Sequence, residues 1–136
     1  MFVDTSAFVA LFHERDQRSA EARAFFAGVR DGRLRARPIY TSEYVVDELV
    51  TTLLGRVGHD RASRALEALR ETSLVNVLHV DGSTYELAVD RFLAYDDHDL
   101  SFTDHVIGVQ ALDRGVDLVV SFDQEFAALG LSTLPE

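Results

Sequence analysis

Short apolar runs alternate with longer amphipathic segments along the whole chain. Five runs have the apolar or alternating pattern of buried strands: Phe2–Val3, Ile39–Thr41, Leu74–Val80, Leu118–Ser121 and Leu131–Leu134. Segments with apolar residues at helical spacing separate them: Ala7–Phe12, Asp16–Val29, Ser42–Val57, Asp60–Thr72, Tyr85–Tyr95, Thr103–Arg114 and Asp123–Leu129. The alternation predicts one α/β domain over residues 1–136, with a central parallel sheet of roughly four to five strands flanked by helices.

Local signals add detail to two of the predicted helices. Gly58 is a typical helix stop, and Asp60 is placed to cap the helix that follows it. The segment Asp16–Val29 is expected to have one buried face. We expect this face to consist of Ala20, Ala24, Phe25 and Val29.

The composition narrows the classes of protein that the chain can belong to. Of its 136 residues, 47% are hydrophobic and 26% are charged, as in ordinary globular domains. The absence of Cys excludes disulfide frameworks, thiolate zinc sites and cysteine nucleophiles, and it fits a reducing compartment. An acid at Asp4 and a charged run from His13 leave no room for a signal peptide. Since no apolar run approaches the roughly 18 residues of a membrane helix, we expect a cytoplasmic protein without a membrane partner.

The charge balance is strongly acidic. The chain has 23 acidic residues against 13 basic ones, which gives a formal net charge of −10, and every basic residue is Arg. The lack of Lys excludes a Walker P-loop, a Schiff base and a lysine general base. Two explanations of this composition stay open: adaptation to high internal salt, which we prefer, and the Arg codons of a GC-rich genome.

The negative charge also bears on nucleic-acid binding. It argues against a general nucleic-acid-binding protein, because phosphate groups are attracted to positive surfaces. A metal-dependent nuclease partly escapes this objection, since its cations meet the phosphate. One basic cluster lies within a short stretch: Arg30, Arg33, Arg35 and Arg37. Taken alone, this cluster is more typical of a solvated loop than of a binding site.

Two acids follow strands of the predicted sheet. Asp4 comes directly after Phe2–Val3, and Asp123 comes shortly after Leu118–Ser121. Ligands of parallel sheets bind outside the carboxyl ends of the strands, and neighbouring strands lie about 4.8 Å apart. Two such carboxylates can therefore share or flank one metal ion. Each acid also precedes a predicted helix, and for either one alone N-capping explains its position as well as catalysis does.

Two further candidate acids lie in helical segments. Glu48 is in SEYVVDELVTTLL, off the apolar stripe of that helix, but the spacing alone does not separate it from Glu43 and Asp47. Asp104 is in LSFTDH, where Ser101 and Asp104 have the spacing of a capping box. A solvent-facing acid and a capping residue are therefore the alternatives to a catalytic role at these positions.

Four motifs occur in a fixed order along the chain: DTSA after the first apolar strand, an acid in VVDELV, then LSFTDH, and SFDQEF near the end. This combination resembles the PIN-domain family, and specifically its VapC-type toxins, over nearly the whole chain. The resemblance implies a PIN-like fold and an acidic quartet of site residues, namely Asp4, Glu48, Asp104 and Asp123. It further implies that Ser6 is an accessory hydroxyl near the metal or the substrate.

The activity implied by the resemblance is hydrolysis of RNA by an endoribonuclease that uses Mg²⁺ or Mn²⁺, hard cations that carboxylate oxygens prefer. Such ions, when bound, activate water and neutralise charge on the phosphate. Asp4 would then be the central ligand, Asp104 and Asp123 would complete the cage, and Glu48 would ligate or orient the water. The implied partners are the RNA substrate, a small antitoxin that covers the acidic pocket, and a second copy of the chain in a homodimer.

The same sequence features allow other interpretations. His98 and His105 lie near Asp104 in the sequence and are either close to the metal or, more simply, exposed loop and helix residues. A domain that transfers phosphoryl groups to an aspartate with Mg²⁺ is disfavoured, because the chain has neither Lys nor a DxDx[TV] motif. A non-catalytic PIN-like module that binds RNA or protein is the remaining alternative, and a metal-dependent nuclease assay separates the two.

Overall fold

The computed structural model describes residues 1–35, 38–96, 99–123 and 125–135. Within these ranges the chain forms a five-stranded, wholly parallel sheet with the strand order β3-β2-β1-β4-β5. The strands are β1 (Phe2–Val3), β2 (Ile39–Ser42), β3 (Val75–Leu78), β4 (Leu118–Val120) and β5 (Ser132–Leu134). The predicted α/β fold with a central parallel sheet is confirmed.

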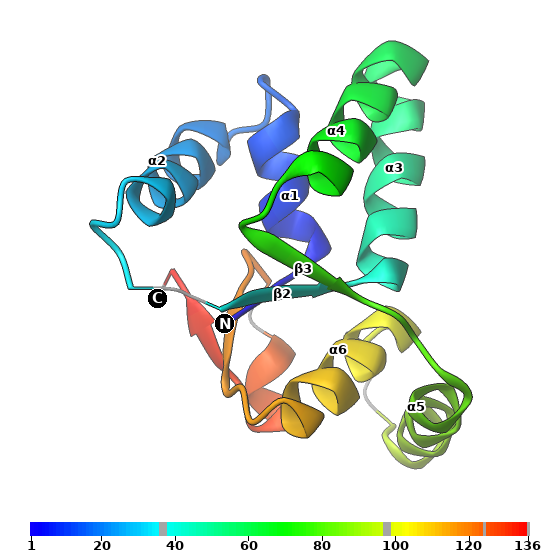
Figure 1. The fold of residues 1–136 in the computed structure, drawn as a ribbon. Helices are drawn as coiled ribbons and strands as arrows, with labels where there is room; N and C mark the ends of the chain where they lie inside the picture. The colour runs from blue at the N-terminus through cyan, green and yellow to red at the C-terminus, as the bar shows by residue number, and fades with distance from the viewer. Residues whose placement is uncertain (36–37, 97–98, 124, 136) are drawn as a thin grey trace.

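Helices cover both faces of this sheet. They are α1 (Thr5–Phe12), α2 (Ser19–Arg30), α3 (Glu43–Val57), α4 (His59–Glu71), α5 (Gly82–Ala94), α6 (Phe102–Asp113) and the short 3-10 helix η1 (Glu125–Leu129). Figure 1 shows α1 to α4 on one side of the sheet and α5 and α6 on the other. Within the described residues, no helix is long and apolar enough to cross a membrane.

The core forms where the apolar positions of the strands meet those of the helices. Phe2 and Val3 of β1 are fully buried in the middle of the sheet. Helix α3 buries Val45, Leu49 and Leu53, which recur every four residues and so lie on one face. Gly58 ends this helix with a φ of +94°, a backbone conformation that favours glycine, as the sequence predicted.

Two local predictions were wrong. Helix α2 begins at Ser19 instead of Asp16, and its buried residues include Ala22 and Val29, whereas Ala20 and Ala24 are exposed. The Asp16 side chain instead accepts a hydrogen bond from the Arg18 backbone, in a turn that precedes the helix. Asp60 provides no side-chain cap for α4, which begins directly after Gly58.

The strand order places a crevice beside β1. The chain continues from β1 to β2 and β3 on one side, whereas β4 and β5 lie on the other side. In parallel sheets, ligands bind outside the carboxyl ends of the strands where the order reverses in this way. Asp4 follows β1, and the segment from Ser121 to Asp123 follows β4. The fold therefore brings the two strand-end acids to the same edge, as the sequence predicted.

Candidate active site

Asp4 is the most buried acid at this edge, with 3% of its surface exposed. It occupies the N-cap position of α1 but makes no side-chain capping hydrogen bond. Its Oδ2 atom instead accepts a hydrogen bond from the Ser121 hydroxyl at 2.8 Å and a longer one from the Ser6 hydroxyl at 3.4 Å. Helix capping thus does not explain why an acid stands at this position.

Ser6 and Ser121 hold the segment after β4 against Asp4. The Phe122 N–H donates to Ser6 Oγ at 2.9 Å, and the Asp123 N–H donates to Ser121 Oγ at 3.0 Å. The two hydroxyl oxygens lie 3.1 Å apart, and because Ser121 donates its single proton to Asp4, the Ser6 hydroxyl donates either to Asp4 or to Ser121 Oγ. Ser121 is fully buried. The network therefore fixes the Asp4 carboxylate and the Asp123 backbone relative to one another.

The electrostatic surroundings of Asp4 favour its protonated form. Burial raises the pKa of Asp4 to about 7, and the nearby carboxylates of Asp104 and, more weakly, Asp123 raise it as well. The hydrogen bond from Ser121 opposes this rise, because it stabilises the charged form. A buried carboxylate that meets two other acids is a group that a bound cation would stabilise strongly.

Asp104 caps a helix and also lies near the other acids of the site. The Ser101 N–H donates to its Oδ2 at 2.9 Å, and its own N–H donates to Ser101 Oγ at 3.1 Å, so a capping box starts α6. Partial burial nevertheless raises the pKa of Asp104 to about 6, with contributions from Glu48 and Asp123. Asp104 therefore caps a helix and also lies within the electrostatic reach of the other acids.

The structure separates the three acids of α3. Glu43 is turned toward β3: its Oε1 atom accepts a hydrogen bond from the Val80 N–H at 2.6 Å and lies 2.9 Å from His79 Nδ1. Asp47 is exposed and lines a hollow of about 330 Å³ together with Glu48. Of the three, Glu48 alone also lines the pocket that Asp123 lines.

This polar pocket has a volume of about 490 Å³ and lies beside the serine network. Its lining includes Thr5, Ser6, Arg18, Glu48, Arg56, Phe122 and Asp123. Asp4 is buried next to it and reaches it through the hydrogen bond to Ser6. Within the described residues, no three Asp, Glu, His or Cys side chains are gathered closely enough to hold one ion as they stand. Neighbouring acids thus raise the pKa values of Asp4 and Asp104, but the acids do not form a preassembled metal site.

The remaining candidates have other surroundings. His105 is buried, with its ring against those of Phe92 and Tyr95 between α5 and α6, so the expectation of an exposed histidine was wrong. His98 lies outside the described residues. In the basic cluster, Arg30 and Arg33 form exposed ion pairs with Asp31, as expected of a solvated loop, and Arg37 lies outside the described residues.

Comparison with known families identifies the fold that carries this site. The family model of the PIN domain matches residues 1–131. The chain belongs to the PIN domain family. A PIN domain relative, the 23S rRNA-specific endonuclease VapC20 of Mycobacterium tuberculosis, is 32% identical over 130 residues, which cover 96% of this chain and 94% of the relative.

Solved structures agree with this assignment. The crystal structure of Mycobacterium tuberculosis VapC20, described as a sarcin–ricin loop cleaving toxin, superposes with a TM-score of 0.86 at 30% identity and covers 96% of this PIN domain and 95% of that chain. A toxin–antitoxin complex from Klebsiella pneumoniae has a TM-score of 0.65 at 19% identity, with 97% and 95% covered. FitAcB from Neisseria gonorrhoeae has the same TM-score at 18% identity, with 97% and 94% covered. The last two likenesses concern the fold alone.

The sequence pattern did not indicate one residue that organises the site of this PIN domain. Ser121 lies at the end of a predicted strand, yet its hydroxyl donates to Asp4 and accepts from the Asp123 backbone. The available signal was a polar residue closing the otherwise apolar run LVVS, two residues before an acid. A buried hydroxyl at a strand end needs a partner, and here the partner belongs to the neighbouring strand end.

Proposed function

We propose that this PIN domain is a metal-dependent endoribonuclease that hydrolyses RNA phosphodiester bonds, and that it is the toxin of a toxin–antitoxin pair. The observation that carries the proposal is the buried Asp4 carboxylate, whose pKa is raised to about 7 beside other acids at the carboxyl edge of the sheet. The relationship to a 23S rRNA-specific endonuclease over 96% of the chain supports the choice of RNA as substrate.

We further propose which residues hold the metal. Asp4 would be the central ligand, Asp104 and Asp123 would complete the site, and Glu48 would ligate the ion or orient the attacking water. These are oxygen donors only, which fits Mg²⁺ or Mn²⁺ better than softer metals. Because no three acids of the described residues are gathered around one point, we expect their side chains to change rotamer when an ion binds.

The chain's own residues would perform three tasks in the reaction. A bound divalent cation would supply neutralisation of phosphate charge and a lower pKa for the attacking water. Ser121 and Ser6 would keep the Asp4 carboxylate oriented, through the hydrogen bonds described above. Glu48, which lines the pocket, would accept a proton from the water or hold it by a hydrogen bond. Ser6, at the pocket wall, would in addition contact the substrate.

The test is a cleavage time course with a fluorescently labelled RNA. We expect cleavage with Mg²⁺ or Mn²⁺, none in EDTA, and a strong loss in Asp123→Asn. The matched control is Asp60→Asn, because Asp60 is an exposed acid of α4 that pairs only with Arg64 among the described residues. Cleavage in EDTA would contradict the metal mechanism, and cleavage with Zn²⁺ alone would indicate a site that contains histidine. No cleavage with any metal would favour the non-catalytic alternative.

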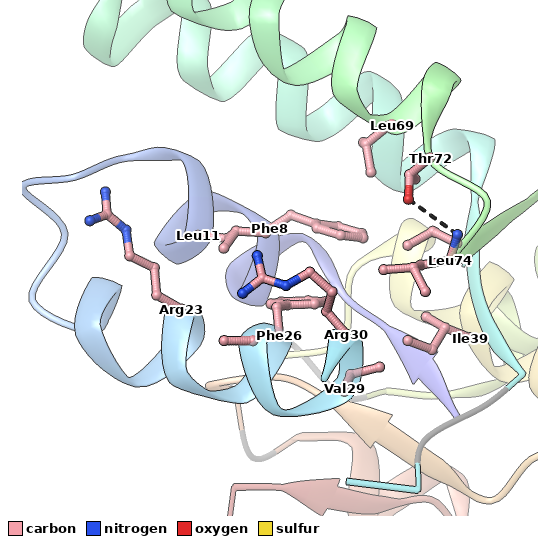
Figure 2. A pocket seen from close by; sticks show the side chains of 12 residues that line it. Phe8, Leu11, Arg23, Phe26, Val29, Arg30, Ile39, Leu69, Thr72 and Leu74 are labelled. Atoms are coloured by element: carbon pink, nitrogen blue, oxygen red, sulfur yellow. Dashed lines mark hydrogen bonds between the residues drawn. The ribbon is translucent and has the colours of Figure 1, made fainter. Parts of the chain in front are cut away.

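We propose that the antitoxin, which the family resemblance places over the acidic pocket, also binds an apolar groove between α1, α2 and the end of α4. The groove has a volume of about 480 Å³. Figure 2 shows the side chains of Phe8, Leu11 and Phe26 gathered in it, with Arg23 and Arg30 also among its lining residues. The Phe8 and Phe26 rings are stacked 5.8 Å apart. Apolar surface bordered by arginines fits an apolar chain segment that carries acidic residues. One solved structure of the same fold is described as a toxin–antitoxin complex.

We also propose a homodimer in the cytoplasm. Helix α5 and the residue after it expose large apolar side chains, the most exposed being Leu93 at 77%. Tyr85, Leu87, Phe92 and Tyr95 are also between 43% and 48% exposed, although Tyr85 and Phe92 pack partly against Phe102. A second copy of the chain would cover this apolar surface. Sedimentation velocity should give a dimer for the wild type and a monomer for Leu93→Glu, and an unchanged dimer in the variant would place the interface elsewhere.

A further inference from the structure

Two arginines and one aromatic ring line the polar pocket beside the acids. Arg18 precedes α2, Arg56 lies in the last turn of α3, and Phe122 follows β4. The guanidinium carbon of Arg18 lies 4.8 Å from the centroid of the Phe122 ring, within the range of a cation–π contact. The Phe122 N–H is in turn bonded to Ser6 Oγ. Arg18 is thereby connected to the network that orients Asp4.

Neither guanidinium is committed to a strong internal partner. Arg18 pairs with Glu21 at 2.9 Å, but the two side chains are 49% and 44% exposed. Exposed pairs of this kind contribute little to stability, so another anion can replace Glu21. Arg56 is exposed and forms no ion pair with any residue that the structure describes. Both side chains are therefore available to a ligand that enters the pocket.

The charge of the molecule determines which ligand these arginines fit. An RNA strand that approaches a chain with a net charge of −10 is repelled. The acids next to the pocket add to that repulsion until a cation is bound. Arginine offers a planar pair of N–H groups that matches the oxygens of a phosphate. Two arginines from different elements at the pocket wall supply positive charge at the place where an RNA strand must come close.

We propose that Arg18 and Arg56 bind phosphate groups of the RNA strand in this pocket, and that Phe122 positions Arg18 for this contact. The inference rests on the proposed function, because it takes RNA as the substrate. It assigns a binding role to two arginines and a positioning role to Phe122, none of which belongs to the acidic quartet.

The first experiment measures binding without cleavage. Fluorescence anisotropy of a labelled single-stranded RNA in EDTA, over a salt series, gives the dissociation constant and its salt dependence. Each phosphate contact on a single strand contributes about −0.7 to the slope of log K against log salt. We expect Arg18→Gln and Arg56→Gln each to make the slope less negative by about this amount and to weaken binding about tenfold at low salt. Arg70→Gln, an exposed arginine of α4 outside the polar pocket, is the control with the same charge change.

The second experiment isolates the role of Phe122. Phe122→Leu keeps an apolar side chain but removes the ring that Arg18 contacts. We expect it to weaken RNA binding in the wild-type background and to have no further effect in the Arg18→Gln background, because a positioning residue acts only through the residue it positions. An effect of Phe122→Leu that persists in full beside Arg18→Gln would overturn this role and indicate direct contact of the ring with RNA.

The outcomes also separate this inference from the proposed function. Cleavage in Mn²⁺ is measured in parallel, and the arginine variants should raise KM with little change in kcat. If the wild type binds RNA with the expected slopes but never cleaves it, the nuclease proposal fails and the arginine proposal stands. If the wild type cleaves RNA but Arg18→Gln and Arg56→Gln match Arg70→Gln in slope and in KM, the arginine proposal is overturned. If the wild type does not bind RNA in the anisotropy assay and the arginine variants do not raise KM, the arginine proposal is likewise overturned.

Discussion

Two pockets of nearly equal volume lie on different sides of one short helix. The apolar groove measures about 480 Å³ and the polar pocket about 490 Å³. Helix α1 contributes Phe8 and Leu11 to the groove, and Thr5, Ser6 and Val9 to the polar pocket. The other walls of the groove are mainly aliphatic and aromatic, whereas those of the polar pocket carry acids, hydroxyls and arginines.

The comparison shows that size alone does not indicate what a pocket binds. Exposed apolar surface is unfavourable in water by about 25 cal/mol per Å², so the groove is stabilised by any apolar segment that covers it. Carboxylates held near one another repel each other. A bound cation relieves this repulsion, whereas an apolar segment does not. Changes to one pocket should therefore leave the occupant of the other unaffected.

The largest expected effect is at the buried carboxylate of the polar pocket. Asp4→Asn keeps the size of the side chain and removes the charge, so RNA cleavage in Mn²⁺ should fall by at least about a hundredfold. In EDTA the same variant should melt at a higher temperature, with a gain of about 1–3 kcal/mol, because a carboxylate whose pKa is raised to about 7 no longer has to ionise among other acids.

A cleavage assay beside thermal melts in EDTA measures both effects of Asp4→Asn. Binding at the apolar groove serves as the control for correct folding and should not change. Retained cleavage would remove Asp4 from the site.

A charged side chain placed in the apolar groove should weaken antitoxin binding and leave RNA cleavage nearly unchanged. Ala27 lines the groove, and Ala27→Arg would place a long charged side chain in it. Antitoxin binding should weaken about a hundredfold, since burying an unpaired charge costs several kcal/mol, while RNA cleavage stays within about twofold of the wild type. Calorimetric titration with a purified antitoxin measures the binding.

Ala20→Arg is the matched control for this groove variant, because Ala20 is exposed on the same helix and does not line the groove. Equal weakening by both substitutions would show that the partner binds elsewhere.

A smaller effect is expected from Ser121. Ser121→Ala removes the donor to Asp4 Oδ2, so the pKa of Asp4 should rise further. Cleavage near pH 7 should fall about tenfold, as for the loss of one hydrogen bond to a charged group, and should partly recover at higher pH. A pH–rate profile shifted toward alkaline pH relative to wild type is the measurement. Ser132→Ala, at an exposed serine of β5, should leave the profile where it was, and an unshifted profile in Ser121→Ala would contradict the positioning role.

The last expected effect is on the stability of the metal-free chain, not on its activity. Burial first of all raises the pKa of Asp4 to about 7 and that of Asp104 to about 6, above the value of about 3.9 for an unfolded Asp. Between about pH 4 and 7 the folded chain therefore binds more protons than the unfolded one, and its stability falls as the pH rises through this window.

We expect a loss of a few kcal/mol or less, mostly from Asp4, because Asp104 is partly exposed and screened. Denaturant titrations in EDTA at several pH values measure it. Mn²⁺ should reduce the fall, and a stability that rises from pH 5 to 7 in EDTA would contradict the assigned surroundings of both acids.

The sequence predicted those features that depend on neighbours along the chain. The apolar runs became strands, Gly58 ended α3, and Asp4 and Asp123 came to one edge because the carboxyl ends of parallel strands share an edge. The choice among Glu43, Asp47 and Glu48 required the rotation of α3 against the sheet, which packing determines. The buried face of α2 was predicted wrongly because a turn at Asp16 delays the start of the helix.

The sequence could not predict the organising role of Ser121 or the two pockets, because both depend on contacts between elements that are distant along the chain. Ser121 lies far from Asp4 in the sequence, and its partner becomes visible only when β1 and β4 are neighbours. The groove depends on the relative placement of three helices, none of which encodes it alone. The roles of Asp4, Glu48, Asp104, Asp123 and Ser6 in catalysis stay predictions until the variants above are assayed.

The position of α1 between two pockets has a consequence for genetic selection. A saturation library of Thr5–Phe12, screened once for loss of growth inhibition and once for loss of neutralisation by the antitoxin, should yield two classes of alleles within these eight residues. Alleles at Thr5 and Ser6 would fall in the first class and alleles at Leu11 in the second, whereas most changes at the buried Phe8 and Val9 would unfold the domain and so also fall in the first class. Because one helical turn takes about 3.6 residues, Ser6 and Leu11 lie on different faces of α1, so the two phenotypes should separate by face of the helix.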